Sequence, residues 1–333
     1  MKRIITKEEF TKLLAVLSGD YQIIGPMEPS QRGIFYQPIA DMKDLYLGER
    51  FATESIKKFF LSPSEHLFKS HHTSDGEVLE EVSPEEGKRI IVGLRPCEAR
   101  GLVLLDKVFD AEDYKDEPYL NNRKRSILVG LGCTKPDTSC FCASLGGSPA
   151  DSRGMDALMF PFRDEFVIEI ISGAAKEIFG NKGRDLTEEE TKALEAAKEK
   201  AKESLEFKIS PPESMDAIFE DGYWGRVSGA CVSCGICTFL CPTCHCFDLV
   251  DEQRSRLRCY DGCAFSDFTE EASGHNSRPT KRERYRQRVY HKFDYFKANF
   301  NENLCVGCGR CIRFCPVKIN IAEVANNAPV HSK

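Results

Sequence analysis

Two short runs of cysteine near the C-terminus constrain this chain more than any other feature. Both have the spacing C-x2-C-x2-C-x3-C, and a proline follows each run directly. The first run is Cys231, Cys234, Cys237 and Cys241, and the second is Cys305, Cys308, Cys311 and Cys315. Bacterial ferredoxins that hold two [4Fe–4S] clusters have this ligand spacing, which lets three thiolates in a tight turn reach three irons of one cubane. The runs therefore predict a dicluster fold.

The fourth cysteine of each run begins a helix that points away from the other three, so it reaches the second cluster. The expected ligand sets are therefore crossed between the runs. One cluster takes Cys231, Cys234, Cys237 and Cys315, and the other takes Cys305, Cys308, Cys311 and Cys241. Structural zinc held by four thiolates is the alternative. Iron–sulfur is preferred, because zinc sites rarely use ligands in this compressed order twice in one chain.

The composition of the chain is consistent with cysteines that stay reduced and bind metal. The 333 residues are enough for two domains, and the net charge of −6 gives no general attraction to nucleic acid or anionic lipid. The N-terminus, MKRIITKEEF, lacks a signal-peptide core, and no apolar stretch approaches the length of a membrane span. We therefore expect a cytoplasmic protein. In that compartment, grouped cysteines are usually metal ligands rather than disulfides.

The N-terminal part reads as an α/β domain. A buried strand (RIIVGL, 89–94), a helix (98–109) and a second buried strand (SILVGLG, 126–132) predict a βαβ unit with parallel strands. We also expect helices after Thr6 and over 187–206, the latter charged and on the surface. The expected fold is thus an N-terminal α/β domain over 1–212 and a ferredoxin-type domain over 213–333. Paired prolines at 211 and 212 mark the boundary.

A second group of cysteines belongs to the α/β domain. Its members are Cys97, Cys133, Cys140 and Cys142. Cys97 follows the first strand of the βαβ unit and Cys133 the second, so both should lie at the sheet edge where α/β folds bind ligands. A third [4Fe–4S] cluster, a zinc ion and ordinary buried cysteines all remain open. Arg95 and Arg100 are close enough in sequence to stabilise a cluster's charge or, as a weaker idea, to activate a catalytic thiol.

Residues 242–304 form a long insertion between the two ferredoxin runs. It contains four further cysteines, Cys244, Cys246, Cys259 and Cys263, and a basic segment, KRERYRQR, at 281–288. That segment could be a nucleic-acid arm, but in an acidic chain we favour a structural or partner-docking helix. Cys244, Cys246 and Cys263 could bind a further metal or could simply line the packing against the clusters. His245 could be a ligand, although a lone histidine is more often structural.

Several segments together resemble a known family. They are LRPCEARGLVLLDKVF (94–109), GCTKPDTSCFCASLGG (132–147), CPTCHCF (241–247) and EASGHNSRPTKRERYRQRVYHK (271–292), with LSPSEHLFK (61–69) in addition. They look like the iron–sulfur beta subunits of cytoplasmic hydrogenases and sulfhydrogenases, and the corresponding subunit of anaerobic sulfite reductase is similar. The resemblance covers about residues 60 to 320. One departure is Cys259, where similar proteins tend to have an aromatic residue, which argues against a shared four-cysteine site in the insertion.

The resemblance implies a 4Fe–4S dicluster subunit with two kinds of partner. One partner is a flavin- and [2Fe–2S]-containing subunit that binds NAD(P)H, and the other is a catalytic subunit such as a hydrogenase or sulfite reductase. We therefore expect an electron-transfer subunit without catalytic residues of its own. The alternatives are a self-standing oxidoreductase with its active site in the α/β domain, and an iron–sulfur nucleic-acid-binding protein. No G-x-G-x-x-G after a strand and no P-loop signals a nucleotide site.

Overall fold

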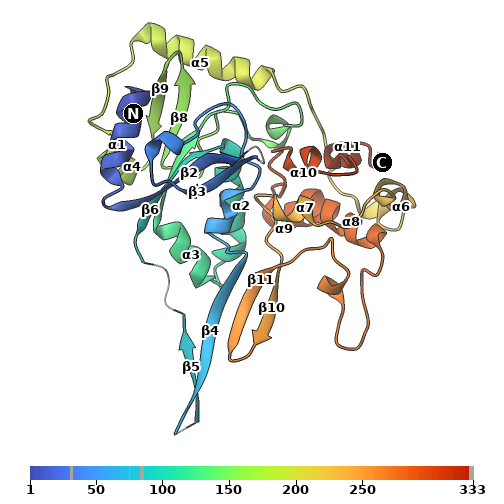
Figure 1. Ribbon diagram of the computed structural model, residues 1–333. Coiled ribbons are helices and arrows are strands. Elements are labelled where there is room, and N and C mark those ends of the chain that lie inside the picture. Colours follow the sequence, from blue (N-terminus) through green and yellow to red (C-terminus); the bar gives the residue numbers. More distant parts are fainter. Residues whose placement is uncertain (31–32, 75, 83–85, 330–333) are drawn as a thin grey trace.

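The computed structural model describes residues 1–30, 33–74, 76–82 and 86–329; the predicted domain end at 330–333 lies outside them. A seven-stranded mixed sheet dominates the N-terminal part, in the order β1-β9-β8-β7-β6-β2-β3 (Figure 1). Strands β2, β6, β7 and β8 run in parallel, and β1, β3 and β9 pair antiparallel at the edges. Their bounds are β1 Lys2–Thr6, β2 Tyr21–Ser30, β3 Gly33–Pro38, β6 Lys88–Leu94, β7 Ser126–Leu131, β8 Ala157–Phe162 and β9 Glu165–Ile170.

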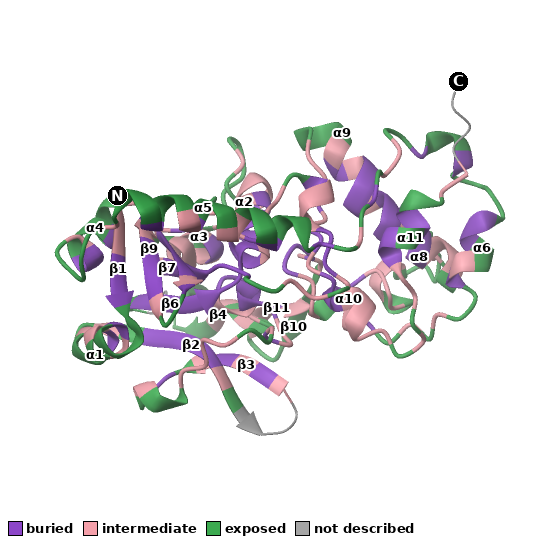
Figure 2. Cartoon of the chain, turned by 90° about the horizontal axis from the view of Figure 1, so that it is seen from above, coloured by how far each residue is buried: buried purple, intermediate pink, exposed green. Residues whose placement is uncertain are grey.

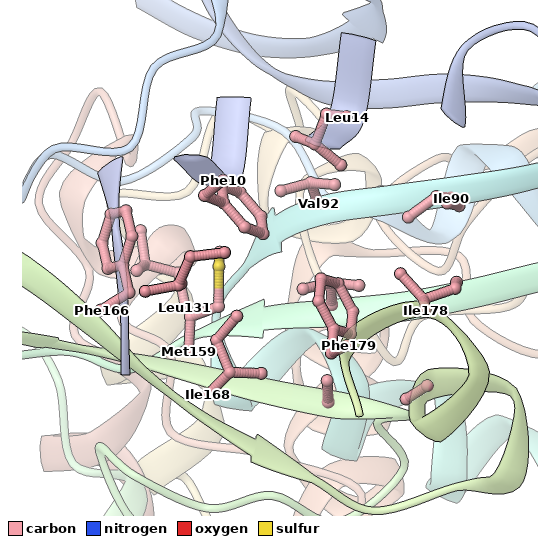
Figure 3. Close-up of a cluster of buried hydrophobic side chains, with 14 of the residues drawn as sticks. Phe10, Leu14, Ile90, Val92, Leu131, Met159, Phe166, Ile168, Ile178 and Phe179 are labelled. Atoms are coloured by element: carbon pink, nitrogen blue, oxygen red, sulfur yellow. The ribbon is translucent and has the colours of Figure 1, made fainter. Parts of the chain in front are cut away.

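Helices cover both faces of this sheet, which explains the unbroken apolar runs in its parallel strands. In β6, Ile90 and Val92 pack toward α1 (Lys7–Leu17) and α4 (Gly173–Phe179), and Figure 3 shows them in one cluster with Phe10 and Phe179. Ile91, between them, packs on the opposite face against α2 (Pro96–Phe109) and α3 (Glu117–Lys124). Burial follows this layering in Figure 2, where the central strands are buried and the outer helix faces are exposed.

The elements expected from the sequence in this part are present. Strands β6 and β7 pair in parallel with α2 between them, which is the expected βαβ unit. Thr6 and Glu9 form the capping box of α1 through reciprocal hydrogen bonds of 3.1 and 2.9 Å. Helix α5 (Glu188–Glu203) is a surface helix that buries little beyond Leu194, as its charge pattern predicts.

The C-terminal part is built from short helices around a separate core. They are α6 Tyr223–Ser228, α7 Ile236–Phe239, α8 Lys281–Tyr290, a π-helical turn His291–Tyr295, α9 Phe296–Phe300, α10 Arg310–Arg313 and α11 Ile321–Asn326. Trp224, Tyr290 and Phe293 are fully buried at its centre. Phe141, from the loop after β7, enters this same core. Single 3-10 turns occur at Met42–Asp44, Ile56–Phe59, Cys142–Leu145, Asp216–Ile218 and Asp267–Thr269.

A second, antiparallel sheet joins the two halves of the sequence. Its order is β10-β11-β4-β5, and it projects from the body of the molecule in Figure 1. Strands β4 (Ser64–Thr73) and β5 (Gly76–Glu81) precede the βαβ unit, whereas β10 (Phe247–Glu252) and β11 (Ser255–Tyr260) lie in the insertion. Packing therefore crosses the boundary expected near Pro211, and the division into two domains stays a prediction.

One half-buried charge network fixes this sheet to the α/β layer. The Arg258 side chain on β11, 4% exposed, pairs with Glu65 on β4 at 2.7 Å and with Asp116, the N-cap of α3. Replacing Arg258 with methionine should lower the free energy of unfolding by about 3 kcal/mol, since two partly buried carboxylates lose their cation. Arg256 on the same strand provides a matched control.

Arg256 pairs with Asp251 at 2.7 Å, and both side chains are exposed, at 41% and 69%. Exposed pairs contribute little, so Arg256→Met should change the unfolding free energy by less than about 1 kcal/mol. Denaturant unfolding of the two variants beside the parent measures the difference. Equal losses in both variants would show that burial of Arg258 does not set its contribution.

Candidate iron–sulfur centres

Cysteines from distant parts of the chain line three cavities. The first cavity is lined by Cys231, Cys234, Cys237 and Cys315, together with Cys311. The middle cavity is lined by Cys241, Cys305, Cys308 and Cys311. The third is lined by Cys97, Cys133, Cys140 and Cys142, together with Cys308. Each of the three sets expected from the sequence thus gathers at one cavity, although ligand binding by these sets stays a prediction.

The first two cavities form because the two cysteine runs pack against each other. In each run the third cysteine lies in a single helical turn, α7 in the first and α10 in the second, and these turns are in contact. The chain then leaves each turn toward the other run. Cys315 therefore lies with the first three cysteines of the other run, and Cys241 lies likewise with the second run.

The third cavity lies at the carboxyl edge of the parallel strands. Cys97 is the second residue of α2 and lies three residues beyond the end of β6, and Cys133 lies two residues beyond the end of β7. The loop carrying Cys140 and Cys142 then folds onto the second cysteine run, where the Phe141 N–H donates to the Gly307 carbonyl at 2.9 Å. Gly307 has a φ of +66°, and a Cβ there would lie 2.6 Å from Phe141 backbone. Glycine is needed for this close approach.

Hydrogen bonds to sulfur support the fit of iron–sulfur clusters, since such bonds accompany cluster thiolates. The Ser233 N–H donates to Cys231 Sγ at 3.4 Å, and the Ile319 N–H donates to Cys315 Sγ at 3.3 Å. Arg313 Nη1 lies 4.0 Å from Cys140 Sγ. The sulfurs of the first and third sets are therefore already in contact with donors.

Burial makes these thiols reluctant to ionise on their own. It raises the pKa of Cys311 and of Cys142 to about 12, and that of Cys140 to about 11. Burial also raises the pKa of Cys133, while the nearby charge of Arg95 opposes the rise. A bound metal deprotonates a coordinating thiol outright. Cluster assembly should therefore release protons.

Two buried cations line the middle cavity. Arg288 in α8 and Lys292 in the π-helical turn are 4% and 2% exposed. Burial acts to lower the pKa of Lys292, but negative charge on Cys241 and Cys244 outweighs it, so the pKa ends above the usual value. Lys57, 3% exposed, lies nearby and donates to the carbonyls of Thr238 and Cys244. The basic segment at 281–288 carried the signal for Arg288, but nothing in the sequence singled out Lys57.

Two of the extra cysteines of the insertion have a polar side chain as neighbour. Cys244 Sγ accepts from Arg288 Nη1 at 3.3 Å, and Cys259 Sγ lies 3.5 Å from Ser64 Oγ. Within the described ranges, no three histidine, cysteine or acidic residues are placed to hold one metal ion. The choice between iron–sulfur and zinc at the third cavity stays a prediction.

His245 has a structural environment. Its ring packs against His291 at 5.3 Å and against Phe109 at 5.9 Å, both edge-on, and its Nδ1 lies 3.1 Å from the Thr243 carbonyl oxygen. Burial and the charge of Lys292 lower its pKa to about 4, so the ring is neutral near pH 7. The histidine thus joins the insertion to α2.

A buried ion pair holds the third cavity against the ferredoxin part. Glu98 in α2 and Arg310 in α10 pair directly, and their side chains are 0% and 1% exposed. Glu98 also accepts from Ser55 Oγ at 2.6 Å and from the Ile56 N–H at 3.1 Å. The carboxylate that follows Cys97 in sequence is therefore fixed to the arginine that precedes Cys311. This pair links the two halves of the chain between the cysteine sets.

Comparisons with known proteins identify the family of the chain. Residues 230–319 match the family model described as a 4Fe-4S dicluster domain. Sulfhydrogenase 2 subunit beta of Pyrococcus furiosus is 34% identical over 281 residues, covering 80% of this chain and 80% of that protein. The chain belongs to the sulfhydrogenase beta subunit family.

Membership of the sulfhydrogenase beta subunit family confirms the resemblance seen in the sequence and makes this chain an iron–sulfur, electron-transport subunit of an oxidoreductase. No solved structure matches the chain. Among the described residues, no helix has both the length and the apolar character needed to cross a bilayer.

Proposed function

We propose that this chain relays single electrons between two other subunits of a cytoplasmic hydrogenase-type complex. One partner is a flavin- and [2Fe–2S]-containing subunit that binds NAD(P)H, and the other is a catalytic subunit such as a hydrogenase or a sulfite or sulfur reductase. The proposal fits the P. furiosus relative, which is named as a subunit of a sulfhydrogenase. The chain would hold two [4Fe–4S] clusters on the crossed sets and a third on Cys97, Cys133, Cys140 and Cys142.

The observation that carries this proposal is that the three cavities adjoin in a row. Cys311 lines both the first and the middle cavity, and Cys308 lines both the middle and the third. A [4Fe–4S] cluster supplies one-electron redox chemistry when bound. The protein's own part is to hold the three sets side by side and to leave one end accessible. That end is the first cavity, where Cys234 is exposed and the Val232 beside it is 59% exposed.

The alternatives have less support. A self-standing oxidoreductase would need acid–base groups at the third cavity, but its lining in the described structure consists of cysteines, prolines, Phe51, Ser148 and Gly307. A nucleic-acid arm would present the basic residues of α8 to solvent. Instead Arg288 is buried, and Arg286 Nη1 donates to the Phe219 carbonyl at 2.7 Å. This favours a structural role for the helix.

Redox assays on the purified full chain test the relay. Its visible absorbance should bleach when dithionite is added, because one-electron centres accept electrons without substrate. The isolated chain should not oxidise NAD(P)H. Electrons from NAD(P)H should reach it only when a flavoprotein partner is added. Oxidation of NAD(P)H by the chain alone would overturn the relay and favour the self-standing enzyme.

A further inference from the structure

The middle cavity differs from the others in the charge of its wall. Arg288 and Lys292 both line it, both are buried, and neither has a carboxylate partner among the described residues. Lys292 Nζ donates to Thr243 Oγ1 at 2.8 Å, and Arg288 Nη1 donates to Cys244 Sγ at 3.3 Å. Buried charges are costly unless something of opposite sign compensates them. The wall is therefore built to face a buried anion.

The helix geometry directs both side chains to this cavity. Arg288 lies in the last turn of α8, and Lys292 lies four residues later in the π-helical turn His291–Tyr295. Residues four apart share one face of a helix, and single π-helical turns are frequent at functional sites. Asp294, in the same turn, accepts from the Met215 N–H at 2.7 Å and so is engaged elsewhere.

The other two cavities lack this pair of charges. Arg288 also lines the first cavity, but Lys292 does not. Among the described residues, no charged side chain lines the third cavity. Of the arginines near the third cavity, Arg310 pairs with Glu98, and Arg95, beside Cys133, donates to the carbonyl of Gly132 at 3.2 Å. Arg313 pairs with Asp137 at 3.0 Å and also lies 4.0 Å from Cys140 Sγ. Arg100 is 5% exposed and its Nε and Nη1 have no hydrogen-bond partner among the described residues, but it lines none of the three cavities.

We propose that Lys292, supported by Arg288, gives the centre of the middle cavity the highest reduction potential of the three. This inference rests on the proposed relay. Four thiolates make a [4Fe–4S] centre anionic, and reduction adds one more negative charge. A fixed cation in a buried wall favours the more negative form, and burial strengthens that preference. Lys292 acts here as a positioning residue for charge, without touching any substrate.

A high potential at the middle position has a functional consequence. An electron that enters from either end then stays on the middle centre, because the two neighbouring centres have lower reduction potentials. The chain can then keep one electron while one partner subunit carries none. Electrons delivered in pairs by a hydride donor could thus leave one at a time, with the middle position as the store.

Potentiometric titration of the full chain, monitored by electron paramagnetic resonance, tests the proposal. In Lys292→Met the reduction step of highest potential should move to lower potential. The equilibrium constant for that step should fall about tenfold, or about 59 mV for a one-electron couple. The other steps should stay in place. Lys292→Arg keeps the charge and should restore the parent value.

Two further variants make the result decisive. Lys292→Gln removes the charge but keeps a hydrogen-bond donor for Thr243 Oγ1. It should therefore show the same fall in potential as Lys292→Met, which would exclude a packing defect as the cause. Lys297→Met removes a lysine of α9 that lines none of the three cavities and donates to the Glu213 carbonyl instead. The Lys297→Met variant should leave every reduction potential unchanged. Unshifted steps in both neutral Lys292 variants, at full iron content, would overturn the inference. A parent chain without iron and acid-labile sulfide would instead contradict the relay itself.

Discussion

Replacing Cys315 with alanine is expected to remove iron from the cavity formed by the other cysteine run. The reason is the crossing: Cys315 lines the first cavity with Cys231, whereas its own run lines the middle one. Loss of one thiolate ligand should cost about four irons per chain. The measurement is iron and acid-labile sulfide per chain, together with the absorbance of the oxidised protein.

Pairs of substitutions test the crossing more sharply than either single change. If Cys231 and Cys315 serve one centre, the double variant should lose no more iron than each single variant. Cys305→Ala combined with Cys315→Ala should lose about twice as much, since these cysteines serve two centres. Uncrossed ligand sets would reverse this pattern. Cys259→Ala, at a cysteine that lines none of the three cavities, should keep the parent's iron.

The sequence predicted best where ligand geometry is local. Two-residue spacings bring thiolates together within a single turn, so both ferredoxin sets follow from the printed residues. The third set also required the ends of two neighbouring strands to lie at the same sheet edge. The parallel pairing of β6 and β7 meets this requirement. The fourth cysteine of each ferredoxin set, in contrast, comes from the other run, and the third set also needs the loop around Phe141 to fold onto the second run.

Long-range pairing escaped prediction because no local pattern encodes it. The register of β4 against β11 joins Glu65 to Arg258, far apart in the sequence, in strands that alternate weakly. Lys57 gave no signal either, since an isolated lysine is normally exposed. The basic segment at 281–288 was noticed, but sequence alone could not show that Arg288 turns inward. Only the packing of α8 over the cysteine runs decides that direction.

The Phe141 loop shows how the two halves depend on each other. Its phenyl ring lies in the C-terminal core, its N–H bonds to Gly307, and the cysteines on either side of it line the third cavity. A composition-based boundary near 211–212 cannot foresee this, because the loop precedes the boundary by many residues. The third cysteine set is therefore held by both halves of the chain, and its formation should depend on correct folding of both.

Replacing Cys133 with alanine is the second large effect we expect, because it tests whether the third set binds a cluster. Three centres correspond to about twelve irons in the parent chain, and the variant should retain about eight. The first and middle centres should keep their resonance signals, since Cys133 lines neither of their cavities.

The alternatives to a third cluster give different metal contents. A parent with about eight irons and no zinc would mean that Cys97, Cys133, Cys140 and Cys142 are ordinary buried cysteines, and Cys133→Ala would then change nothing in the iron content. Zinc at about one ion per chain, lost in the variant, would mean a structural zinc site. A third cluster is supported by one result alone: about twelve irons in the parent chain, falling to about eight in the variant.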